Sequence, residues 1–502
     1  MFNTQLPLED VVRNGAGFFF SVIAGLFYIM SPQDFDQLCD KVYRSVAQPE
    51  TVDVAEICAV AAVGSQYGTQ VVPDQVKNSL FRTAIAHIDD LIETSSTRGI
   101  RSIACLCAYG IIEKRRSTRS LIYLGLQLAR WALNRPIDDM ETDILTKKLY
   151  RTMVLLECWL ATSLGYKPDL SDDEIQLGLA SIHSAPCGIT DNTTQTKVSE
   201  IGLLKARIVL ESSGHDPPTM RTIEDMMKRL DVWHHGLPRS MTLAALMAED
   251  TKPLTAAQQG ALFLAHAWFL GAVVLLHRRI LVANADSMLD SRQPPIVSLH
   301  PEAQHYHNRC VEAARSSVRI FIMLGFGTAT TKMHVRCWLC LFEIFIACTV
   351  LLYDLGVKLL MQYDDDLIVT EDLKRAEACL GMLKASAKVD RVSGLLYGKL
   401  HWIFRELKMV HQEQTPLTSI SATIVQASTS NAIHTVPGVP AAFGSSYNRQ
   451  SYTSVTATKI IKQAADILRD PFGHGEKADF DLLLRCCGPQ SPDWWETKCE
   501  GE

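Results

Sequence analysis

Apolar side chains recur along most of the chain at intervals of three and four residues. The stretch QVKNSLFRTAIAHIDDLIE, for example, places Leu80, Ala84 and Ile88 on one face of a helix. The strict alternation that is typical of β-strands is hard to find over any useful length. The pattern therefore predicts an all-α protein, a large multi-helix bundle with a dozen or more helices and no sheet.

Several of these helices carry recognisable start signals. Ser31, Pro32 and Asp34 have the order of an N-cap, a first helical position and a first-turn acid. Thr255 and Gln258 have the spacing of a capping box. Later helices are expected to begin near four positions: Pro301, Val335, Glu371 and Val389.

The helical pattern stops near residue 412. Residues 412–458 are rich in Ser, Thr, Pro, Gly and Ala and lack a sustained apolar period, so we expect a flexible linker there. Residues 459–502 are expected to form a short tail that mixes acids with aromatic side chains. This divides the chain into a helical body over 1–411, the linker and the tail.

Two apolar stretches raise the question of a membrane. Residues 17–30 are shorter than the ~20 residues that a bilayer span needs, and they lack the charged start and cleavage site of a signal peptide. Residues 337–353 carry Glu343 near their middle, which favours a buried core helix. We therefore expect a soluble chain with no membrane partner.

Composition narrows the possible partners and the compartment. With 502 residues, 47% of them hydrophobic, the chain can bury a large core. Its net charge of −6 supplies no overall basic field for phosphate backbones, so no direct sequence-specific DNA contact is expected. The 14 cysteines are scattered, several within apolar stretches, as is typical of reduced intracellular thiols.

One acidic residue interrupts an apolar helix face in LTKKLYRTMVLLECWLATSLGYKP, residues 145–168. Glu157 falls among the apolar positions, where a carboxylate is costly unless it is paired. We expect either an Arg from a neighbouring helix or a raised pKa, and we favour a structural role over a general acid or base. One arc of the same helix is expected to be polar: Lys147, Lys148, Arg151, Thr152, Thr162 and Ser163.

The same stretch resembles the central element of the fungal-specific transcription factor domain, also called the middle homology region. The pattern of that family is a basic pair, aromatic residues, an acidic residue on the helix and then Gly-Arg-Pro. Six residues stand at the matching positions: Lys147, Lys148, Tyr150, Glu157, Gly165 and Pro168. The chain departs from the pattern with Glu in place of the usual Asp, and with Tyr166-Lys167 where Gly-Arg-Pro is typical.

Other segments resemble landmarks of this family in the same order, so the resemblance spans roughly residues 15–410. These segments are 59–68, 80–92 and 116–136 before the central element, and 230–238, 273–281 and 310–316 after it. The resemblance implies an all-α regulatory domain, a role in transcription regulation and a location in the nucleus.

Most members of that family also carry six cysteines that hold two zinc ions and read DNA. This chain has no cysteine before Cys39, and its only Cys-x-x-Cys pair, Cys337 to Cys340, lies in an apolar helix without a second pair nearby. A structural zinc site needs four ligands, so no metal site and no cofactor are expected. We therefore expect a regulatory domain without its own DNA reader, or a truncated gene model of a complete zinc-cluster factor.

Other chemistry receives little support from the residues. The basic run 113–119 is either a weak nuclear-import signal or, preferably, a solvated helix connection. The acidic run 363–367 invites comparison with terpene cyclases, but Asn192, Thr196 and Glu200, which match their second metal motif, precede it in reversed order. The histidines, such as His234 and His266, are expected in core, loop or surface roles rather than as metal ligands.

The preferred hypothesis is a nuclear transcription regulator, not an enzyme, of a fungal metabolic or secondary-metabolite pathway. Its expected partners are the transcription machinery or a DNA-binding protein, with a small molecule as a further candidate. The tail supplies a candidate activation segment, or else an ordered cap: Asp479, Phe480, Asp481, Leu482, Leu483, Leu484, Trp494 and Trp495. The alternative is a helical fold repurposed as a biosynthetic enzyme, of a cyclase type, or as a small-molecule-binding protein.

Overall fold

Every regular element in the described part of this computed structural model is a helix, so the all-α class is confirmed. The described residues are 6–67, 72–135, 140–175, 193–212, 219–247, 256–289, 301–325, 337–361, 363, 365–414 and 445–471.

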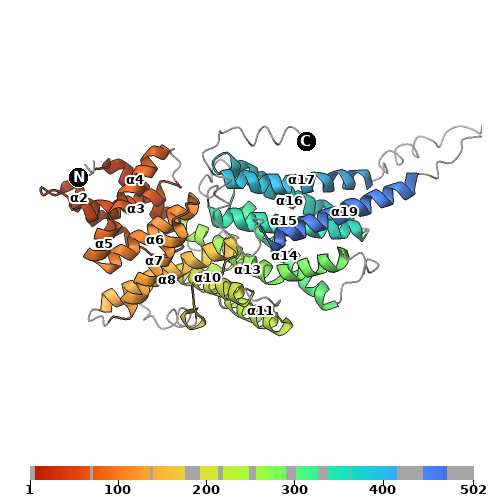
Figure 1. The fold of residues 1–502 in the computed structure, drawn as a ribbon, viewed down its shortest axis with the longest axis horizontal. Coiled ribbons are helices and arrows are strands. Elements are labelled where there is room, and N and C mark those ends of the chain that lie inside the picture. The colour runs from red at the N-terminus through yellow and green to blue at the C-terminus, as the bar shows by residue number, and fades with distance from the viewer. Residues whose placement is uncertain are drawn as a thin grey trace, which may run out of the picture.

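The N-terminal helices gather in one lobe, drawn in red to orange in Figure 1. They are α1 (Glu9–Phe18), the π-helical turn η1 (Phe19–Ile23), α2 (Pro32–Arg44), α3 (Thr51–Gly64), α4 (Asp74–Ala86), α5 (Ile88–Thr94), α6 (Ser96–Ile112) and α7 (Thr118–Leu133). Within the lobe, α3 packs against α1, α4 and α6, and α6 packs against α7.

A second group of helices lies between the N-terminal lobe and the rest of the molecule (Figure 1). It comprises α8 (Met140–Leu164), α10 (Thr193–Ser212), α11 (Met220–His235), the 3-10 turn η2 (Arg239–Met241), α12 (Leu243–Met247) and α13 (Ala256–Leu289). Helix α8 packs against α7 on one side and α10 on the other, and α10 in turn packs against α13. The central helices therefore connect the two ends of the elongated molecule.

The remaining helices form the C-terminal lobe. They are α14 (Pro301–Met323), α15 (Trp338–Leu360), α16 (Asp366–Ala387), α17 (Arg391–Gln414) and α19 (Ser445–Arg469). Helix α15 is the centre of this lobe, because α14, α16, α17 and α19 all pack against it. One continuous hydrophobic core runs from Val12 in α1 to Leu468 in α19.

Two helices, α13 and α15, are long and apolar enough to cross a membrane by length and composition alone. Their most apolar windows are 89% and 100% buried inside the fold, as expected of core helices. Glu343, the acid within the apolar stretch of α15, forms a buried ion pair with Lys205 of α10. A partner from another helix therefore compensates the charge that the sequence placed in this core helix.

The helix starts predicted from the sequence are largely confirmed. Ser31 caps α2: its hydroxyl accepts from the Asp34 N–H, and the Asp34 carboxylate accepts from the Ser31 N–H. Helices α14, α15 and α17 begin within three residues of the predicted positions, whereas α16 begins five residues early, at Asp366. Thr255 of the predicted capping box lies outside the described residues.

The boundaries expected at the C-terminal end of the chain differ from those of the structure. Helix α17 continues to Gln414, beyond the expected boundary at 411, and α19 begins at Ser445, inside the segment 412–458 that was expected to be a linker. Ile460 and Ile461 of α19 are fully buried. Helix α19 therefore belongs to the helical body, because its apolar face completes the core of the C-terminal lobe. Residues 415–444 lie outside the described part.

Candidate functional site

Glu157 lies in the C-terminal half of α8, with only 3% of its surface exposed. Its two oxygens accept from two donors that follow the helix: the Tyr166 hydroxyl at 2.9 Å and the Asp169 backbone N–H at 2.8 Å. Burial raises the pKa of Glu157, although both hydrogen bonds oppose this effect. The Arg nearest to this prediction contacts the partner of Glu157: the Arg119 guanidinium stacks on the Tyr166 ring at 4.2 Å.

The Gly-x-x-Pro turn, residues 165–168, ends α8. Gly165 has a φ of +78°, a left-handed conformation that glycine adopts without strain, and its N–H donates to the Ala161 carbonyl at 2.8 Å. Pro168 is buried just beyond the turn. Arg130 of α7 then holds the following segment by an ion pair with Glu174 at 2.6 Å. The carboxylate of Glu157 and this turn therefore form one structural unit.

The basic and aromatic residues of the motif lie near the start of the same helix. Lys147 pairs with Asp143 at 2.7 Å on an exposed surface, while Lys148 lies over the Tyr28 ring at 4.8 Å. Burial lowers the pKa of Lys148. The Tyr150 hydroxyl donates to Glu174 at 3.1 Å, so this aromatic residue also contacts the segment after the turn.

The polar arc expected on α8 is wrong for the second half of the helix. Thr152, Thr162 and Ser163 are all buried. Their hydroxyls are satisfied internally: Thr152 donates to the Tyr28 carbonyl at 2.7 Å, and Ser163 accepts from the Trp338 indole at 3.0 Å. Helices surround α8 on several sides, so its small polar side chains bond to carbonyls of α8 itself, as Thr162 does to Trp159, or to neighbouring segments instead of to water.

The basic run 113–119 is also less solvated than expected. Lys114 is 5% exposed and pairs with Asp390 at 2.6 Å, which links the N-terminal lobe to the start of α17. Arg115 stacks on the Phe81 ring at 4.0 Å. Two of its charges therefore contact the fold instead of water, which differs from the solvated connection that was expected.

The described residues contain no group of three or more His, Cys, Asp or Glu side chains arranged to hold a metal ion. Cys337 and Cys340 are buried free thiols at the start of α15. His266 and His277 donate to the backbone carbonyls of Met241 and Val273 at 2.8 Å and 2.7 Å. Glu200 of the terpene-cyclase comparison pairs with Lys197, while Asn192 lies outside the described part.

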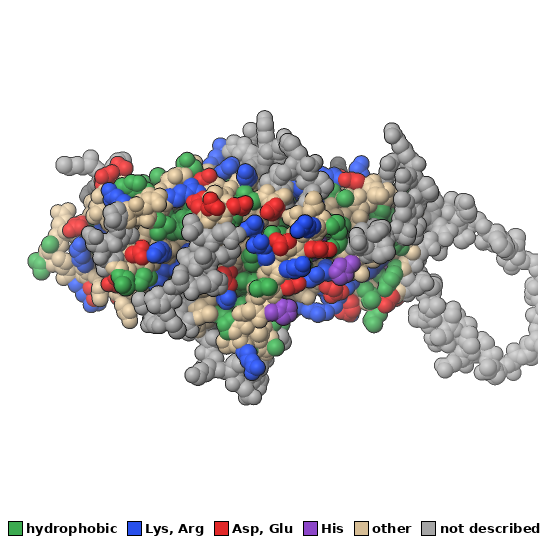
Figure 2. All heavy atoms as spheres, turned by 90° about the horizontal axis from the view of Figure 1, so that it is seen from below, with side chains coloured by type: hydrophobic (Ala, Val, Ile, Leu, Met, Phe, Trp, Pro, Cys, Tyr) green, Lys and Arg blue, Asp and Glu red, His purple; other side chains and the backbone are tan. Residues whose placement is uncertain are grey.

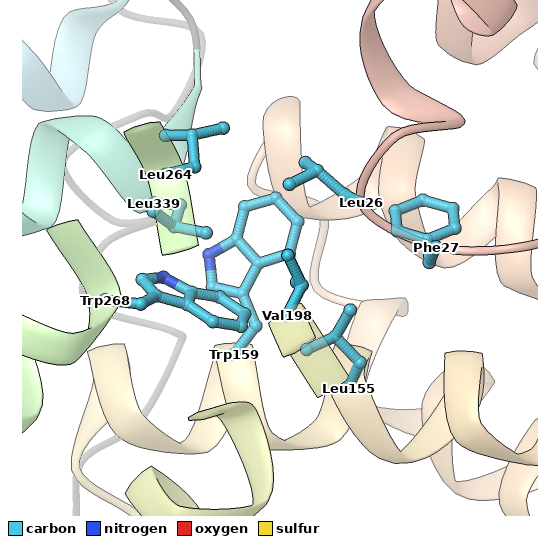
Figure 3. Close-up of a pocket in the computed structure, with 8 residues that line it drawn as sticks. All are labelled: Leu26, Phe27, Leu155, Trp159, Val198, Leu264, Trp268 and Leu339. Carbon is cyan, nitrogen blue, oxygen red and sulfur yellow. The ribbon is translucent and has the colours of Figure 1, made fainter. Parts of the chain in front are cut away.

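A small apolar cavity lies where the central helices meet the N-terminal lobe (Figure 3). It leaves about 10 Å³ of free volume, and eight residues line it: Leu26, Phe27, Leu155, Trp159, Val198, Leu264, Trp268 and Leu339. The indole rings of Trp159 on α8 and Trp268 on α13 meet edge to face, with their centroids 6.2 Å apart. Sequence analysis missed this cavity, because only the tertiary packing brings its residues together.

Sequence analysis also missed a buried charge cluster among α14, α15 and α16. Asp372, whose side chain is fully buried, accepts from Arg315 at 2.5 and 2.8 Å, from Lys358 at 3.0 Å and from Arg375 at 2.9 Å. Burial would raise the pKa of Asp372, but these cations lower it below its usual value. The cluster ties three helices together, and Asp354 extends it to His307 at 2.8 Å.

The candidate activation segment lies outside the described residues, so its eight residues, from Asp479 to Trp495, remain a prediction. Comparisons with known proteins add no family: no protein-family model, curated protein or solved structure matches this chain.

Proposed function

We propose that the chain is a nuclear regulator of transcription, built on a helical scaffold of the fungal transcription factor domain type. The observation that carries this proposal is the structural unit around Glu157. The motif carboxylate, the Gly165 turn and Pro168 come together at the end of α8, the helix that joins the lobes. These contacts stabilise the middle of the helical scaffold. A stable scaffold is suited to a domain that binds other molecules.

The distribution of charge favours action through a protein partner. On the face shown in Figure 2, Lys and Arg side chains are interspersed with Asp and Glu and do not gather in one patch. The net charge of the chain is −6. Non-specific DNA affinity comes mainly from basic side chains that neutralise phosphates. In this proposal a DNA-binding partner protein or the transcription machinery therefore supplies the contact with promoters.

An enzymatic role is the less favoured alternative. Both oxygens of Glu157 already accept hydrogen bonds within the fold, which favours a structural carboxylate over one that transfers protons to a substrate. The small cavity is lined by apolar and aromatic residues. Such a lining suits the binding of an apolar molecule better than acid–base chemistry.

A reporter experiment tests the proposal. The full chain, tagged and fused to an unrelated DNA-binding domain, is expected to enter nuclei and to change transcription from the matching reporter by severalfold. A matched variant in which Phe480, Trp494 and Trp495 are replaced by Ala is expected to lose activation if the tail docks these side chains in a coactivator groove. Exclusion of the tagged chain, without the fusion partner, from nuclei would contradict a regulatory role.

A further inference from the structure

Two neighbouring positive charges on α8 lack a negatively charged partner. Lys148 and Arg151 are both partly buried, and they stand three residues apart on one face of the helix. Within the described part of the chain, neither side chain makes an ion pair or a hydrogen bond, and the Tyr28 ring under Lys148 is uncharged. Burial lowers the pKa of both groups, and the charge of Arg151 lowers the pKa of Lys148 further.

Other partly buried arginines of this chain are compensated by carboxylates. Three examples are Arg98 with Glu56 at 2.7 Å, Arg130 with Glu174 at 2.6 Å and Arg315 with Asp372 at 2.5 Å. Charged groups that leave bulk water are normally paired, because their desolvation is costly. The two cations of α8 depart from this rule together, and the departure calls for an explanation.

The two cations lie where α8 meets the segment that follows η1. The Thr152 hydroxyl, next to Arg151, donates to the Tyr28 carbonyl at 2.7 Å, and Lys148 Nζ lies 4.8 Å from the centre of the Tyr28 ring. These contacts hold this part of α8 against the N-terminal lobe. The backbone that carries both cations is therefore fixed before any ligand binds, which lowers the cost of binding one.

We propose that Lys148 and Arg151 bind the phosphate group of a small molecule. A phosphate monoester carries a charge of about −1.5 to −2 at pH 7, which matches two cations, whereas a carboxylate would leave one of them uncompensated. The guanidinium of Arg151 offers paired N–H donors to two phosphate oxygens, and the ammonium of Lys148 adds a point charge. This ligand adds to the regulatory scaffold proposed above, but the inference rests on these two side chains alone.

Equilibrium dialysis of the full chain against ³²P-labelled inorganic phosphate tests the proposal. Potassium chloride keeps the ionic strength constant, so that general screening does not change during the titration. Wild type is expected to bind one phosphate per chain in a saturable manner, with a dissociation constant of about 1 mM or lower. Unlabelled acetate, which carries a single negative charge, is expected to compete at least about tenfold more weakly than unlabelled phosphate.

Three variants locate the site. Lys148→Met and Arg151→Met are each expected to weaken phosphate binding by about tenfold or more, so one folded variant of the two suffices. Without phosphate, Arg151→Met is expected to unfold at the same temperature as wild type or higher, because it removes an unpaired charge. Lys147→Met is the matched control: Lys147 is the neighbouring residue and pairs with Asp143 on the surface, so binding is expected to stay within about twofold.

Three results would overturn the proposal. They are the absence of saturable phosphate binding by wild type, competition by acetate as strong as that by phosphate, and equal binding by Lys147→Met and Arg151→Met. The regulatory role would stand in each case, because it does not depend on a ligand at this site.

Discussion

At the scale of single residues, Glu157 shows how a charged side chain is tolerated in an apolar helix. The sequence predicted its burial and a compensating partner, and both oxygens do accept hydrogen bonds. It did not predict that Tyr166 and the Asp169 N–H would supply them in place of an Arg. Those donors reach Glu157 only because Gly165 turns the chain back toward α8, and the direction of a turn is not visible in a helical period.

Substitutions at Glu157 separate the hydrogen bonds from the charge. Glu157→Ala is expected to lower the free energy of unfolding by about 2–4 kcal/mol, because it leaves the Tyr166 hydroxyl and the Asp169 N–H without acceptors. Glu157→Gln is expected to cost less than about 1 kcal/mol, since its amide can accept from Asp169 and donate to the Tyr166 oxygen. Urea unfolding of the three proteins measures both changes; equal losses in the two variants would contradict this structural role.

The pH dependence of unfolding tests the burial of the same carboxyl. Because burial raises the pKa of Glu157, the folded chain retains a proton that the unfolded chain releases between the ordinary and the raised pKa. The stability from this group is present in full below the ordinary pKa and is lost as the pH rises through the folded pKa. We expect wild type to lose stability relative to Glu157→Gln over that interval in urea unfolding at several pH values. A constant difference would show that the pKa is not raised.

At the scale of elements, helices that are distant in sequence are joined by charges as well as by apolar faces. Arg315 and Asp372, which meet in the cluster of the C-terminal lobe, are 57 residues apart. The helical period predicted α14, α15 and α16 separately, because it depends on neighbouring residues. It could not predict which polar residues would meet once those helices packed together.

Breaking this charge cluster is expected to be costly. Asp372→Asn keeps the size of the side chain but leaves Arg315, Lys358 and Arg375 without their shared anion. We expect the free energy of unfolding to fall by about 2–4 kcal/mol. Lys374→Ala on the same helix is the matched control, because its pair with Glu371 is exposed, and it is expected to cost less than about 1 kcal/mol. Similar losses in both variants, measured by urea unfolding, would contradict the importance assigned to the cluster.

The packing of α19 on α15 depends on a glycine at their contact. A Cβ atom at Gly356 would lie 2.9 Å from Ile460 Cγ2 and 3.1 Å from Ile461 Cγ1. We expect Gly356→Val to lower the free energy of unfolding by about 1–3 kcal/mol through overpacking. Gly381→Ala in α16 is the control: a Cβ there meets nothing within 4 Å, so we expect a gain of about 0.5–1 kcal/mol from helix propensity. If residues 445–458 were a free linker, cleavage there by a protease would be unchanged in Gly356→Val; we expect it to accelerate.

At the scale of the whole molecule, helical periodicity predicted the fold class, because it repeats in almost every segment of the chain. The same periodicity could not predict that one continuous hydrophobic core extends from α1 to α19. The first half of α19, residues 445–458, lacks a clear apolar period in the sequence, so the predicted boundary between linker and tail falls inside this helix. The cavity was missed for a related reason, since its residues come from five separate parts of the chain.

The central claim is that this scaffold regulates transcription through partners and does not itself read DNA. Chromatin immunoprecipitation of the tagged full chain from its native host, followed by binding assays of the purified chain on the recovered promoters, tests it most directly. We predict enrichment at discrete promoters in cells and no sequence-specific binding by the purified chain alone. An absence of promoter enrichment, or specific binding to those promoters without any partner, would contradict the claim.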